Sequence, residues 1–311
     1  MLTKKSFYNN SKNKDFCGTS LFANIYDIPS RDLVNQALVL LKRFNHNVVM
    51  QQHESKQEIG VLLKIPHQFF QRELAKVNVI LPSPDEYAVG IFLMPKDYKQ
   101  KENCIDAIKN ILKYFNLEIF FLRPVPINTD VLKSFSEKGR FFITQIFIKK
   151  TNGKGLLELF NIKLYQARNQ IIKKICFLNG SLLFLSSILI YYKGVSNSFE
   201  KLYPDLSDYL FTSSFAIVHH SKSTHYISGW EVIHSIYPQV SYLTNGEQIK
   251  MVVGKNKKLS LGYVLRNDGF FYFPENNFSI KKNKNDAITI NFIADGQSLV
   301  VDLNKKKVSF I

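Results

Sequence analysis

The 311-residue chain contains little cysteine, and Cys17, Cys104 and Cys176 are its whole complement. A set of three with irregular spacing argues against a disulfide framework and against a zinc site. Scarce thiols of this kind are typical of proteins from a reducing compartment. We therefore expect a cytoplasmic protein that holds no metal.

Long hydrophobic runs are also missing. The first 16 residues are polar and rich in lysine, without the apolar stretch that a secretory signal requires. The longest apolar run covers residues 175–192, but it includes Asn179-Gly180, which favours a turn. A membrane-spanning helix needs about 20 mainly apolar residues. We interpret the run as two buried strands, with a single membrane span as the alternative.

Acidic residues are too few to balance the basic ones. The chain has 41 Lys and Arg but 25 Asp and Glu, which gives a formal net charge of +16. Such a balance can indicate nucleic acid or an anionic membrane as a partner. The lysines are scattered, however, and their densest clusters at 255–258, 281–284 and 305–307 alternate with strand-like segments. We expect no nucleic acid and no membrane as partner. A basic surface binder is the least favoured alternative.

The apolar residues are abundant, at 45% of the chain, and fall into a regular pattern. Helical spacing predicts helices at about 30–44, from about 103, and at 156–174. Apolar runs of strand length predict strands at 17–25, 58–65, 87–94, 118–125, 141–148, 215–219, 259–265, 270–273, 287–294 and 298–302. The pattern indicates one α+β domain of stacked sheets with flanking helices.

Three separated groups of residues occur in an order that is typical of one protein family. The first group is Cys17-Gly18 followed by Leu21-Phe22-Ala23-Asn24-Ile25. The second comprises Tyr87-Ala88-Val89-Gly90, Pro124-Val125-Pro126, Gln145-Ile146-Phe147 and Tyr192-Lys193-Gly194. The third holds His219, Ser223-Thr224, Trp230 and Asn245-Gly246-Glu247. In this order they resemble the class II, glutamine-splitting amidotransferase domain of the glutamate synthase large subunit.

The resemblance divides the chain into a leader, residues 1–16, and a domain over 17–311 that is matched loosely after about residue 254. It implies a four-layer αββα sandwich of the N-terminal-nucleophile hydrolase type. It also implies hydrolysis of glutamine to glutamate and ammonia. It implies no cofactor for this chain, because FMN and the iron–sulfur cluster belong to the synthase part of the family. That synthase part, as a separate subunit, is a candidate partner.

The resemblance assigns roles to three residues. Cys17 would be the nucleophile once the leader, a possible propeptide, is removed. Its freed α-amino group, with a pKa of about 7.7–8.0, would be the base that activates the thiol. Asn245 and the N–H of Gly246 would stabilise the oxyanion. The residues alone favour a small buried hydrophobe at Cys17 and a turn at Asn245-Gly246, and only the resemblance favours the catalytic roles.

Several motifs depart from the family pattern. Ser221 stands where the family has the arginine that grips the glutamine carboxylate, and Lys does not reproduce the bidentate fork of Arg. Lys222 and His225 are the only nearby candidates for a rebuilt clamp. His219, His220 and His225 have poor spacing for a metal site. We expect glutaminase activity to be weakened or lost, and the alternative is a non-catalytic module that binds a protein or a small ligand.

Overall fold

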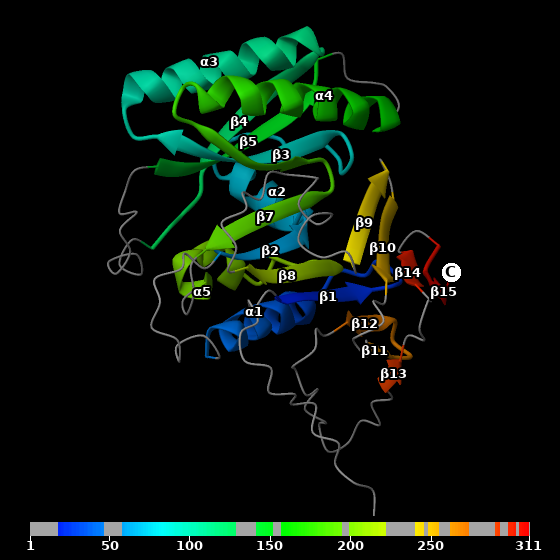
Figure 1. Cartoon of the computed structure of the whole chain (residues 1–311). Coiled ribbons are helices and arrows are strands. Elements are labelled where there is room, and N and C mark those ends of the chain that lie inside the picture. The colour runs from blue at the N-terminus through cyan, green and yellow to red at the C-terminus, as the bar shows by residue number, and fades with distance from the viewer. Residues whose placement is uncertain are drawn as a thin grey trace, which may run out of the picture.

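The computed structural model describes residues 18–46, 58–128, 141–151, 157–194, 199–221, 240–245, 248–254, 262–273, 290–292, 298–302 and 305–310. Four of the residues predicted for the site, Cys17, Lys222, His225 and Gly246, lie outside these ranges. The described part of the chain mixes helices with antiparallel sheets, as expected for an α+β fold (Figure 1).

The largest sheet has seven strands with β1 at its centre. Its order is β13 (Ile290–Phe292), β11 (Gly262–Leu265), β12 (Phe270–Phe273), β1 (Gly18–Asn24), β8 (Phe215–Ser221), β2 (Glu58–Lys64) and β7 (Leu189–Gly194). In β8, Phe215, Ala216, Ile217 and Val218 are all buried, so this strand is covered on both faces. A strand buried on both faces reads as a continuous apolar run.

One face of this sheet is covered by helix α1 (Arg31–His46). The hydroxyl of Ser30 accepts a hydrogen bond from the Leu33 backbone N–H at 3.2 Å, which caps the first turn. The buried side chains Val34, Ala37, Leu38 and Leu41 recur at helical spacing and face the sheet.

A second sheet of four strands lies on the other side of the seven-stranded sheet (Figure 1). Its order is β4 (Leu117–Pro124), β5 (Phe141–Lys150), β3 (Tyr87–Pro95) and β6 (Ser181–Ser186). Its outer face is covered by two helices that lie side by side, α3 (Tyr98–Tyr114) and α4 (Leu157–Cys176). Alternate residues of β3 serve two cores: Val89 and Ile91 belong to the inner core between the sheets, whereas Ala88 and Met94 pack under the helices.

The inner core also contains a short helix, α2 (His67–Ala75). Its residues Phe69 and Phe70 are fully buried, and the Phe70 ring meets Phe147 of β5 edge-on at 5.0 Å between centroids. The chain then crosses from β7 to β8 through α5 (Phe199–Leu202) and the 3₁₀ turn η2 (Pro204–Ser207). We call residues 199–211 the crossover segment.

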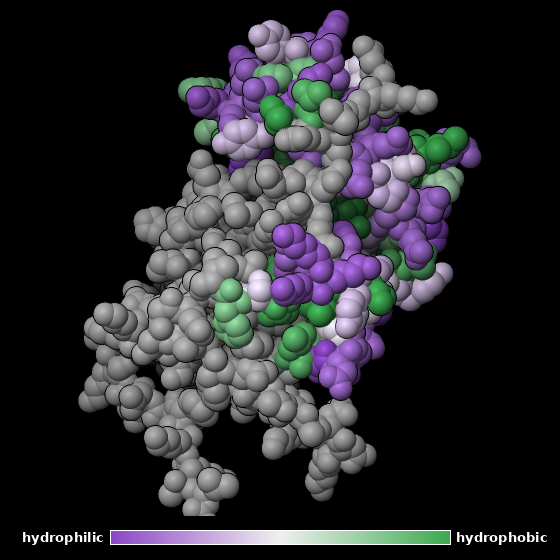
Figure 2. Space-filling model, turned by 90° about the vertical axis from the view of Figure 1, so that its right-hand side faces the viewer, coloured by the Kyte–Doolittle hydropathy of each residue, from purple (hydrophilic) through white to green (hydrophobic). Residues whose placement is uncertain are grey.

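A third sheet is formed by the C-terminal part of the chain. Its order is β15 (Lys307–Phe310), β14 (Ser298–Asp302), β10 (Gln248–Gly254) and β9 (Val240–Asn245). On the described part of the face at the right of Figure 1, hydrophobic residues form small separate groups among hydrophilic ones (Figure 2).

Residues 175–192 contain the two predicted strands and the predicted turn, but both strands follow the turn, and residues 175–176 belong to α4. The two strands exist, but Asn179-Gly180 does not join them: Asn179, with φ +59°, follows the C-terminus of α4, and Gly180 N–H donates to the Ile175 carbonyl. The turn between β6 and β7 lies at Ser187-Ile188 instead. None of the described helices is both long enough and apolar enough to span a bilayer.

Candidate active site

Strand ends of four neighbouring strands meet at one edge of the seven-stranded sheet. Gly18, the first described residue of β1, is paired with His220 of β8. His220 is paired with Ile59 of β2, and Ile59 with Gly194 of β7. Because adjacent strands lie about 4.8 Å apart, this row spans roughly 14 Å. The row therefore lies at the end of β1 that the predicted nucleophile, Cys17, directly precedes in the sequence.

The altered substrate position belongs to the same edge. Ser221 is the last residue of β8, and its backbone is paired with Glu58, the first residue of β2. The structure thus brings Gly18 beside His220 and Ser221 in two adjacent strands, although Gly18 is about 200 positions from them in the sequence.

The crossover segment packs against Gly194, which is the last residue of the row. A Cβ atom added at Gly194 would lie 2.6 Å from the Phe199 ring, so only glycine fits there without displacement of that ring. The Tyr203 hydroxyl donates a hydrogen bond to the carbonyl oxygen of Lys193. These contacts fix the start of the crossover segment against the end of β7.

Asn245 is placed in a different sheet. It is the last residue of β9, and its backbone is paired with Gln248, the first residue of β10. Within the described residues, no strand pairing links this sheet to the sheet that contains β1. The backbone therefore puts Asn245 at the end of a hairpin.

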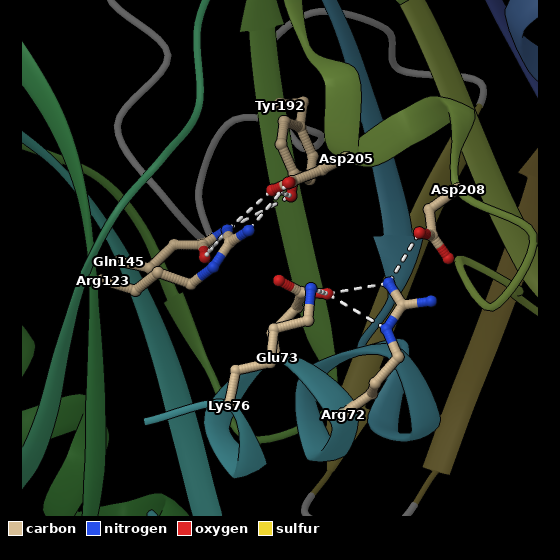
Figure 3. A network of polar contacts seen from close by, with 8 residues as sticks. All are labelled: Arg72, Glu73, Lys76, Arg123, Gln145, Tyr192, Asp205 and Asp208. Carbon is tan, nitrogen blue, oxygen red and sulfur yellow. Dashed lines mark hydrogen bonds and ion pairs between the residues drawn. The ribbon is translucent and has the colours of Figure 1, made fainter. Parts of the chain in front are cut away.

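A buried polar network connects the seven-stranded sheet and the sheet that contains β4 and β5 to the crossover segment (Figure 3). The sequence did not predict this network. The Arg123 guanidinium of β4 donates to both carboxylate oxygens of Asp205 in η2, at 2.7 and 2.8 Å. It also donates to the Gln145 side-chain oxygen at 2.8 Å. The Tyr192 hydroxyl accepts from Gln145 at 3.2 Å and donates to Asp205 at 3.3 Å.

The network is closed to solvent and every partner in it is satisfied. The Arg123 and Asp205 side chains are 10% and 4% exposed. Burial lowers the pKa of Arg123, but the hydrogen bonds to Asp205 outweigh burial and hold that pKa above its ordinary value. Phe69 and Phe70 lie against the guanidinium, with ring centroids 5.5 and 5.9 Å away. The contact of Arg123 with Asp205 is therefore a buried ion pair that joins β4 to η2.

A second, more exposed network ties the crossover segment to α2. Arg72 donates to Asp208 at 2.6 Å and to Glu73 at 2.7 Å, and Lys76 donates to the same Glu73 oxygen at 2.8 Å (Figure 3). Burial acts to raise the pKa of Asp208, and the hydrogen bond from Arg72 lowers that pKa below its ordinary value. Both networks hold the chain that leads into β8, the strand that ends at Ser221.

Sequence features could have pointed to the buried network. Arg123 follows the apolar stretch Ile119 to Leu122, and the polar pair Thr144-Gln145 interrupts an apolar strand. Buried polar residues need partners, so their presence in apolar strands indicates a polar interior contact. The partner Asp205 could not be identified, because the pairing is 82 positions apart. No three described His, Cys, Asp or Glu side chains are grouped so that they could hold a metal ion.

Comparison with known proteins identifies the family. The model of the class II glutamine amidotransferases matches residues 17–261. The glutamate synthase [NADPH] large chain of Bacillus subtilis is 28% identical over 241 residues, which cover 75% of this chain and 15% of that protein. The ferredoxin-dependent glutamate synthase of Pyropia yezoensis is 31% identical over 230 residues, covering 70% and 15%.

The chain spans about 15% of the length of these relatives. Its matched region includes the first described strand, both networks and the β9–β10 hairpin. A family model that covers most of the chain is a stronger finding than any one motif in it. The chain belongs to the class II glutamine amidotransferase family.

Proposed function

We propose that this chain is a glutaminase domain of the glutamate synthase type, in which Cys17 is the nucleophile and the glutamine clamp is weakened. The observation that carries the proposal is the start of the family match, which falls at Cys17 and not at Met1. On this proposal, residues 1–16 are a leader that is removed, and the domain begins at Cys17. On this proposal the layers form the four-layer αββα sandwich of N-terminal-nucleophile hydrolases. These layers are α3 with α4, the four-stranded sheet that contains β3, the seven-stranded sheet, and α1.

The chemistry follows from the free N-terminus of Cys17. A cysteine thiol has a pKa of about 8.5 and needs a base to become a thiolate near neutral pH. The α-amino group of the same residue has a pKa of about 7.7–8.0, so it can accept the thiol proton. The thiolate attacks the side-chain amide carbon of glutamine, ammonia leaves with a proton from the base, and water then releases glutamate from the thioester.

The oxyanion formed in that attack requires preorganised donors. We assign this role to the Asn245 side chain and the Gly246 N–H. Asn245 is the last residue of β9, and its backbone is paired with Gln248 of β10. On this proposal the ammonia passes to a synthase part, because the relatives are glutamate synthases of which this chain matches about 15%. A separate synthase subunit is a candidate for that part.

The weakened clamp follows from Ser221, which ends β8 beside Glu58. A serine cannot give the bidentate, charge-assisted contact that an arginine gives to a carboxylate. Lys222 and His225 are the candidates for a partial replacement. Exchange of Lys222 or His225 for Gln should then raise KM for glutamine further, with little change in kcat.

Removal of the thiol tests the proposed nucleophile. Ammonia release from glutamine by protein that begins at Cys17 should be slow but measurable, and Cys17→Ala should abolish it, because no other group forms the thioester. Cys176→Ala is the matched control, since Cys176 is an exposed free cysteine at the end of α4 and should keep full activity. Release that survives in Cys17→Ala, or that is absent in the unaltered protein, would favour the non-catalytic module instead.

A further inference from the structure

The end of the helical layer where α3 begins and α4 ends has an unusual surface. The turn after α4 lies against the first turns of α3: the Cys104 thiol donates to the Leu178 carbonyl at 3.5 Å, and Gly180 leaves room for the same sulfur. The Asn179 amide reaches Gln100 at 3.5 Å. These contacts bring residues 96–101 and 173–180 to one end of the molecule.

Three exposed aromatic residues lie in or beside these segments. Tyr98, the first residue of α3, is 75% exposed, and Phe177, directly after α4, is 86% exposed. Phe142, near the start of β5, is 50% exposed and lies beside residues 96 and 101. Isolated exposed apolar residues are ordinary, but three large rings gathered at one end call for a reason.

Lysines lie at the same end, two of them over the Phe142 ring. The ammonium groups of Lys96 and Lys101 lie 5.9 and 5.8 Å from the centroid of the Phe142 ring. Lys99, Lys173 and Lys174 are exposed at the same end. We call the three rings and these five lysines the aromatic–lysine end.

Acidic groups do little to offset the lysines. Asp97 caps α3 by accepting the Gln100 backbone N–H at 2.8 Å, and Glu102 is partly buried. In the sequence these residues fall into three separate stretches, which is why the lysines looked scattered there. The fold gathers them into one basic surface with projecting rings.

We propose that the aromatic–lysine end binds the surface of an anionic lipid membrane. Aromatic rings favour the headgroup level of a bilayer, and lysines beside them are attracted by anionic headgroups while their aliphatic stems remain in apolar contact. The combination provides the two signals that stable peripheral binding requires. A single-stranded nucleic acid fits less well, because its bases need free ring faces and the Phe142 ring already carries two ammonium groups. The proposal is independent of glutaminase activity.

Vesicle flotation tests this surface. The whole protein should float with phosphatidylcholine vesicles that contain about 30% phosphatidylglycerol, and should stay behind with pure phosphatidylcholine. Higher salt should weaken the binding, since screening shortens the reach of the lysine charges. Lys173→Gln with Lys174→Gln should reduce binding about thirtyfold. Phe177→Ser should reduce binding at least about tenfold, because it removes an apolar ring.

Matched changes at the other end of α3 provide the controls. Lys109→Gln with Lys113→Gln removes the same charge, and Tyr114→Ser removes a ring that is 76% exposed. These variants should bind like the unaltered protein. Equal losses in both sets, or no flotation with anionic vesicles, would overturn the proposal. Binding to a single-stranded oligonucleotide that depends on Lys173 and Phe177, without vesicle binding, would replace the membrane by nucleic acid and overturn it equally.

Discussion

Exchange of Asp205 for Asn should lower the free energy of unfolding by about 3–5 kcal/mol, the usual cost of removing one partner from a buried ion pair. The Asp205 side chain is 4% exposed and accepts both guanidinium donors of Arg123. An asparagine offers one oxygen in place of two and no negative charge. Arg123 would remain as an uncompensated buried cation, which is the source of the cost.

Urea denaturation measures this loss as a lower transition midpoint at an unchanged slope. Asp106→Asn is the matched control, because Asp106 pairs with Lys109 on the surface of α3 at 3.4 Å and should change stability by less than about 1 kcal/mol. The double change of Arg123→Met with Asp205→Leu should recover most of the loss, since it removes both charges. Equal effects at Asp205 and Asp106 would show that the buried pair does not hold the crossover segment.

Exchange of Ser221 for Arg should raise kcat/KM for glutamine by about a hundredfold, mainly through a lower KM. Ser221 ends β8 in the register that joins it to Glu58 and, through its neighbour His220, to Gly18. An arginine there would again offer a fork of two donors to the α-carboxylate of glutamine. Because the binding contact is made in the ground state and the transition state alike, kcat should change little.

Glutaminase kinetics with glutamine and with glutaramate, which lacks the α-amino group but keeps the carboxylate, would check the effect. Both substrates should gain from Ser221→Arg if the carboxylate is the group that is gripped. Lys113→Arg serves as control, because it places a guanidinium on the exposed surface of α3, outside the proposed site. No gain in Ser221→Arg, or an equal gain in the control, would mean that the lost arginine does not explain weak activity.

Much of the fold follows from local patterns. The strands at 270–273 and 298–302 have the predicted bounds, because a short apolar run between turn residues admits few other structures. Helix α3 begins at Tyr98, five residues before the predicted start, because the cap at Asp97 precedes a polar first turn that apolar spacing cannot detect. Helix α2 was missed altogether, since Phe69 and Phe70 bury adjacent positions without a long periodic face.

Long-range pairing limited what could be said of the site. The order of motifs predicted the family, and the family match confirms it. The contact of Arg123 with Asp205 was missed, because strand and helix patterns contain no information on which distant residues meet. The roles of Cys17, Asn245, Gly246, Lys222 and His225 stay predictions. Asn245 alone among them lies within the described backbone.

The intact mass of the protein purified from its own cells tests the central claim most directly. The α-amino group of Cys17 can act as base only after the bond between Phe16 and Cys17 has been cut. We expect a mass that corresponds to a chain beginning at Cys17. A mass that still includes residues 1–16 in the purified protein would contradict it, because the base that the mechanism requires would not exist.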